Sequence, residues 1–136
     1  MTTANTSPIY PGTPIGTPVT FGTGVAARTV SGVTGLTLLA AATTNGQNID
    51  CVQIVGQGTT TANVVRLWLY TGTGNALLVN EVQISAVTAS LTAAQTIYAP
   101  LFGARGTPFY LAPGQSLYIS TNNTENYNAV AFGGSY

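Results

Sequence analysis

Short apolar runs separated by polar turns make up most of this chain. From residue 33 onward the runs are rich in Val, Ile, Leu, Thr and Tyr, and clusters of Gly, Asn and Pro interrupt them. β-Branched and aromatic residues favour strands, whereas Gly, Asn and Pro favour turns, so the pattern predicts strands throughout. The predicted strands cover residues 33–42, 48–56, 62–71, 76–86, 95–102, 108–112, 115–121 and 126–133.

The spacing of these runs, roughly 10 to 14 residues from one to the next, is typical of a sandwich or a jelly roll. Residues 32–136 are therefore predicted to form a single all-β domain, an antiparallel β-sandwich with a jelly-roll-like topology. Residues 86–94 carry small side chains, and a short helical turn stays open there as an alternative to an extended connection.

One hairpin can be aligned residue by residue. If residues 72–75 form its loop, then Arg66 lies directly opposite Glu81, and Trp68 lies opposite Val79. This register places an opposite-charge pair on one face of the sheet and mainly aliphatic side chains on the other, and a one-residue slip would lose both. We expect Arg66 and Glu81 to form an exposed structural ion pair that contributes on the order of 0.2–1 kcal/mol.

The first 31 residues differ from the rest, because proline recurs every three or four positions from Pro8 to Pro18. Proline fixes φ and lacks an N–H donor, so this segment is predicted to be an extended arm rather than a helix or a central strand. We expect a neighbouring subunit, rather than the body of this chain, to order the arm. The candidate partner-binding residues of the arm are Ile9, Tyr10, Pro11, Ile15, Val19 and Phe21.

The 136 residues include three Arg, three acidic residues and one Cys, with no Lys and no His. Without His the chain cannot form a Ser-His-Asp triad or a Cys-His pair, and three scattered acids and one Cys make no plausible metal site. Three cations do not make a surface for phosphate backbones. We therefore expect no enzyme activity, no cofactor, no metal and no nucleic-acid partner.

Only 4% of the residues are charged and the formal net charge is zero. A chain with so little charge has little to keep its copies apart and few charged residues to protect its strand edges, which favours a protein that works in an assembly. Cys51 lies in an apolar run and is expected in the core. No signal peptide or membrane-spanning segment is visible, so we expect no membrane partner and synthesis in the cytoplasm without secretion.

A sugar-binding sandwich is the competing hypothesis from another class. The chain has seven Tyr, one Trp and a cluster of Asn residues within 122–128. Exposed rings with amides nearby can hold a sugar, and Trp68 and Tyr127 are the residues whose loss would test this. The simpler interpretation is that the aromatic residues fill the core and the Asn residues form turns.

A Thr/Pro/Gly-rich arm precedes a low-charge sandwich, which ends in Leu117–Thr121, an Asn-rich turn and Ala129–Gly134. This arrangement resembles small structural proteins of tailed bacteriophages, and among them capsid decoration, or cement, proteins. The resemblance implies a non-enzymatic virion protein on the capsid exterior, bound to the major capsid protein and self-associated, with a trimer favoured. The resemblance implies no catalytic or metal-binding residues for this chain. A component of the tail, neck or fibre base is the alternative within the same class.

Overall fold

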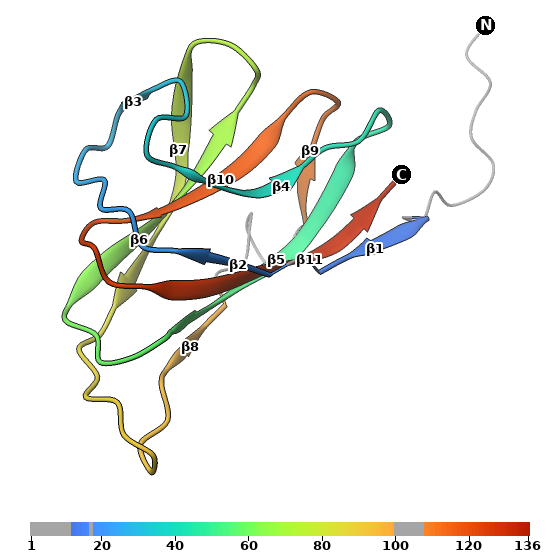
Figure 1. Ribbon diagram of the computed structural model, residues 1–136. Coiled ribbons are helices and arrows are strands. Elements are labelled where there is room, and N and C mark those ends of the chain that lie inside the picture. Colours follow the sequence, from blue (N-terminus) through green and yellow to red (C-terminus); the bar gives the residue numbers. More distant parts are fainter. Residues whose placement is uncertain (1–11, 17, 100–107) are drawn as a thin grey trace, which may run out of the picture.

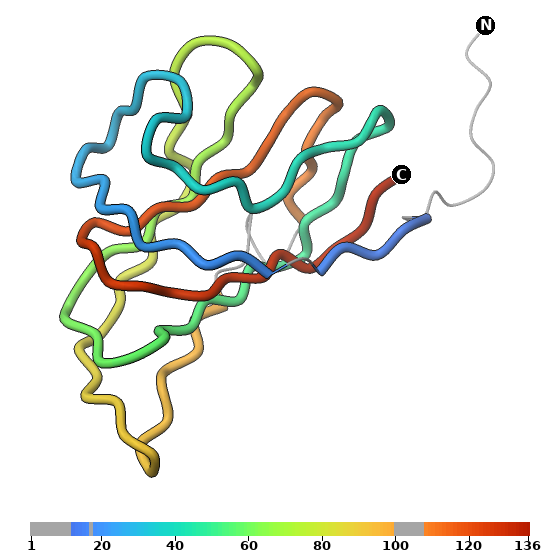
Figure 2. The backbone as a smooth tube through the Cα atoms, in the orientation of Figure 1, coloured from blue at the N-terminus to red at the C-terminus, as the bar shows by residue number. Residues whose placement is uncertain are grey.

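The computed structural model describes residues 12–16, 18–99 and 108–136 (Figure 2). The regular structure in these ranges is entirely β (Figure 1). The strands are β1 Thr13–Ile15, β2 Pro18–Phe21, β3 Val30–Ser31, β4 Thr37–Ala41, β5 Gln47–Gly56, β6 Asn63–Tyr70, β7 Asn75–Ile84, β8 Ile97–Tyr98, β9 Phe109–Leu111, β10 Ser116–Thr121 and β11 Tyr127–Ser135.

The strands form two antiparallel sheets. Sheet A has the order β1-β11-β5-β8, and β2 also pairs with β11 while β9 also pairs with β5. Sheet B has the order β3-β7-β6-β10-β4. The two sheets pack face to face around one main core (Figure 1), so the predicted all-β sandwich is confirmed.

The main core lies between the sheets and takes alternate residues from each strand. On β5 the fully buried residues are Ile49, Val52 and Ile54. Ile49 and Val52 are three positions apart, yet both point inward, because the β5–β11 ladder shifts register between Phe132 and Gly133. A bulge adds one residue to a strand, so the alternation of side chains shifts by one position and Val52 points inward like Ile49.

Each of the eight predicted runs contains a strand, although several boundaries differ. The first run begins at Thr37 rather than at residue 33, because Gly32 and Gly35 have φ values of 58° and 76° and place a turn before β4. The described part of residues 95–102 contains only the short strand β8. Residues 86–94 form no helical turn, and Thr60 and Val87 make an isolated bridge at the start of this loop.

The expectation that a neighbouring subunit orders the arm is wrong for residues 13–15 and 18–21. These residues form β1 and β2, which pair with β11 of their own chain. Phe21 is buried in the core, and its ring lies 5.6 Å from that of Tyr127. Both proline-containing strands are edge strands, where a missing N–H does not interrupt a ladder. The early prolines are therefore compatible with a sheet.

The predicted hairpin is correct at its centre and wrong near its loop. Arg66 pairs with Glu81, as expected, but Trp68 pairs with Leu78 rather than with Val79. The ladder shifts register between Leu67 and Trp68, where a bulge adds a residue that the alignment could not include.

Candidate functional site

The outer face of sheet A carries three large exposed hydrophobic side chains on three different strands. Ile97, Tyr110 and Phe132 are 60%, 52% and 40% exposed. Their chain neighbours Tyr98, Leu111 and Ala131 pack into the core. Because side chains alternate along a strand, the three exposed residues point away from the core, toward solvent.

This face has almost no charge. Asp50 is the only charged residue in the six strands of sheet A, and its carboxylate accepts a hydrogen bond from Asn48 Nδ2 at 3.0 Å. Cys51, which was expected in the core, instead pairs with Phe132 on the outer face and is partly exposed. The expectation failed because the bulge beside Asp50 changes the direction of the next side chain.

Neutral polar side chains that hydrogen-bond to one another border one end of the same face. Gln57 Nε2 donates to Asn128 Oδ1 at 2.7 Å and to Thr20 Oγ1 at 3.2 Å. Thr20 Oγ1 in turn donates to Asn128 Oδ1 at 2.9 Å. An apolar centre with a neutral polar rim is the usual composition of a protein–protein interface.

The expected ion pair on sheet B exists, but it is not an exposed pair. Arg66 is only 4% exposed, and its Nε donates to Glu81 Oε1 at 2.9 Å. Its Nη1 also donates to the Val25 carbonyl at 2.8 Å and to Asn122 Oδ1 at 3.2 Å. The segment between β2 and β3 passes over this part of the sheet and buries the guanidinium, which the hairpin alone could not predict.

A second cation joins the pair. Arg28 Nε donates to the same Glu81 oxygen at 3.0 Å, and the Arg28 side chain is 67% exposed. Hydrogen bonds from Arg28 and Arg66 hold the pKa of Glu81 below its usual range. This three-charge cluster fastens the covering segment to sheet B, and a structural role accounts for all of its contacts.

Glu125 is also held by its neighbours, at the turn between β10 and β11. Its Oε1 accepts hydrogen bonds from Thr61 N at 2.9 Å and Thr61 Oγ1 at 2.6 Å, and its Oε2 accepts one from Tyr127 Oη at 2.8 Å. Burial raises the pKa of Glu125, but these hydrogen bonds outweigh burial and hold the pKa below its usual range. Mainly through burial, the pKa of Tyr127 rises to about 12.

The aromatic residues considered for sugar binding do not offer their rings to solvent. Trp68 and Tyr127 are both fully buried, and Trp68 Nε1 donates to Ser120 Oγ at 2.9 Å. On sheet B, Tyr70 and Tyr118 meet edge to face at an interplanar angle of 87°. Two rings at right angles do not make one flat platform for a sugar.

The predicted arm residues fall into two groups. Ile9, Tyr10 and Pro11 lie outside the described residues. Ile15, Val19 and Phe21 turn toward the core of their own chain. The alternation of apolar Val19 and Phe21 around Thr20 is the sequence signal that could have identified β2 as a strand.

No protein-family model matches this chain, and no curated protein matches it either. In residues 12–16, 18–99 and 108–136 no three potential metal-ligating side chains gather at one place. Nor do these ranges contain a helix long and apolar enough to cross a membrane.

Proposed function

We propose that this protein is a structural component of a virion, which binds the outside of an assembled capsid and holds neighbouring capsid subunits together. The outer face of sheet A carries the proposal. It presents Ile97, Tyr110 and Phe132 to solvent on a sheet with a single charged residue. A free surface of this composition is suited to binding another protein.

The low charge of the face also fits attachment to a repetitive shell. Contacts between neutral groups depend little on ionic strength, whereas contacts between exposed charges are screened by salt. Many copies on one lattice hold neighbouring subunits together even when each single contact is weak. Within residues 1–11, Tyr10 and Pro11 are the proposed contacts with the major capsid protein.

The first test is the copy number of this chain in the purified native particle, measured by quantitative mass spectrometry against the most abundant shell protein. A ratio near one to one, or one to a small integer, is expected for a decoration protein. A handful of copies per particle would assign the chain to the tail, neck or fibre base. Complete absence from particles would refute a virion role.

The second test is rebinding to particles that lack this protein. Phe132→Asp places a charge at the centre of the outer face of sheet A, and we expect binding to weaken at least tenfold. Leu77→Asp is the matched control, because Leu77 is 53% exposed on sheet B. Equal loss in both variants would contradict the assignment of the binding face.

A further inference from the structure

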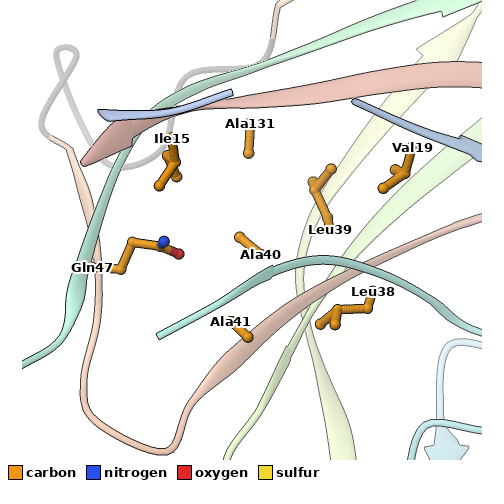
Figure 3. Close-up of a pocket in the computed structure, with 8 residues that line it drawn as sticks. All are labelled: Ile15, Val19, Leu38, Leu39, Ala40, Ala41, Gln47 and Ala131. Atoms are coloured by element: carbon orange, nitrogen blue, oxygen red, sulfur yellow. The ribbon is translucent and has the colours of Figure 1, made fainter. Parts of the chain in front are cut away.

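A crevice of about 380 Å³ opens along the seam between the two sheets. Its walls are β4 on one side and β1, β2 and β11 on the other, and they are mostly aliphatic (Figure 3). This volume is more than twice the roughly 150 Å³ of an apolar cavity that holds one benzene molecule. The crevice therefore has room for several groups of a binding partner. The lining residues are Ile15, Val19, Leu38, Leu39, Ala40, Ala41, Gln47 and Ala131.

One polar group points into this apolar space. Gln47 is 5% exposed, and its Nε2 donates to Ser135 Oγ at 3.2 Å. Its Oε1 is buried and has no hydrogen-bond partner among the described residues, and the side chain extends from β5 into the crevice (Figure 3). A buried acceptor without a partner is destabilising, so the site favours an occupant with an N–H or O–H donor.

The crevice also runs along a strand edge. β4 is the last strand in the order of sheet B, and within the part of the chain that the structure describes it pairs with β10 alone. Its sequence, Thr37–Ala41, contains no charge and no proline. An edge of this kind accepts the backbone of an extended peptide, while side chains of the peptide fill an adjacent pocket.

The chain itself contains the type of segment that packs here. Ile15 and Val19 each follow a proline, in Thr13-Pro14-Ile15 and Thr17-Pro18-Val19, and both side chains point into the crevice (Figure 3). The same pattern occurs a third time as Ser7-Pro8-Ile9, six residues before the first of these two. A third β-branched side chain after a proline is thus available in the residues that precede β1.

We propose that the crevice binds the Ser7-Pro8-Ile9 segment of a second copy of this chain. The segment adds to the edge of β4, Ile9 fills the apolar space, and a backbone N–H of the segment donates to Gln47 Oε1. The proposal goes beyond the capsid-binding function and does not depend on it.

The direction of β1 favours a second copy over the same chain. β1 runs from Thr13, which pairs with Ser135, to Ile15, which pairs with Gly133 and lines the crevice. Gly12 N donates to Ser135 O at 2.8 Å, in line with the β1–β11 ladder. From Ile15 back to Gly12 the chain thus continues along β11, and neither Gly12 nor Thr13 lines the crevice.

The first experiment measures self-association of the full chain by sedimentation velocity over a range of concentrations. We expect concentration-dependent oligomers, and Ile9→Asp should raise the dissociation constant at least tenfold. Ile9→Val keeps the apolar contact and should change the constant less than threefold. Leu91→Asp is the matched control, because Leu91 is fully exposed away from the crevice. An unchanged association in Ile9→Asp, or equal losses in Ile9→Asp and Leu91→Asp, would overturn the proposal.

The second experiment identifies the occupant by methyl NMR on mixtures of differently labelled copies. We expect contacts from Ile9 methyls of one copy to the Leu39 and Val19 methyls of the other. Contacts found only within one copy would overturn the assignment to a second copy. Changes at Leu39 and Val19 on solvent extraction, without a change in association, would show a small-molecule occupant and overturn it as well. Failure of either experiment leaves the particle copy number, and hence the proposed function, unaffected.

Discussion

Replacing Arg66 with alanine tests whether the segment between β2 and β3 covers sheet B as described. Arg66 is nearly fully buried, and three acceptors depend on it, namely Glu81 Oε1, the Val25 carbonyl and Asn122 Oδ1. Glu81 keeps its contact with Arg28, and exposed Asn122 can turn to water, so the main losses are the bond to Val25 and the packing of the arginine stem. We expect Arg66→Ala to lower the free energy of unfolding by about 2–4 kcal/mol.

Arg28→Ala is the matched control on the same carboxylate. The Arg28 side chain is 67% exposed and makes one hydrogen bond to Glu81, so its removal should cost only about 0.2–1 kcal/mol. Both variants remove one cation from Glu81, so the difference between them reports the packing of the Arg66 side chain and its two further hydrogen bonds.

Urea unfolding followed by Trp fluorescence measures both values. Trp68 is the only tryptophan and is fully buried, so its emission should shift to longer wavelength when the chain unfolds. A loss below about 1 kcal/mol in Arg66→Ala, or equal losses in the two variants, would refute the burial of Arg66 and the covering role of the segment.

Three further predictions concern single residues. Contacts with two arginines lower the pKa of Glu81 in the folded state, so its contribution to stability is present above pH 4.5 and is lost as the pH falls through the folded pKa. Glu81→Gln should therefore flatten the acid side of the stability curve, and an unchanged curve would contradict the ion-pair cluster. The folded pKa of Tyr127 is raised to about 12, so stability should fall as the pH rises from 10 to 12, and Tyr127→Phe should remove this loss in alkaline unfolding measurements. A Cβ at Gly133 would overlap the Asn48 carbonyl, so Gly133→Ala should cost about 2 kcal/mol or more by urea unfolding, whereas Gly58→Ala, which meets no atom, should cost far less.

The strands of the domain could be predicted because their ends are marked locally. Gly72 and Gly74, for example, have positive φ values and close the β6–β7 hairpin, and the pairing of Arg66 with Glu81 follows from counting away from that loop. The count failed at Trp68 because a bulge has no reliable mark in the sequence.

The role of the N-terminal segment could not be predicted from its prolines. Proline excludes a central strand but not an edge strand, and only the tertiary structure shows that Pro14 and Pro18 lie at an edge. Likewise, Arg28 is 53 positions from Glu81, so nothing local indicated that the two would meet. The exposed outer face of sheet A could not be predicted locally either, because the position of the second sheet determines which side of a strand faces solvent.

The position of β11 within sheet A sets an order of events during folding. β11 lies between β5 on one side and β1 and β2 on the other, and Thr13 pairs with Ser135, 122 positions later. Contacts of such long sequence separation form slowly, whereas the β6–β7 hairpin is local and can form early. During synthesis, β1 and β2 therefore lack their partner strand until β11 has been made. In that interval the two strands are free to meet the β11 of a neighbouring copy, so slow closure of sheet A gives newly made chains an opportunity to exchange strands.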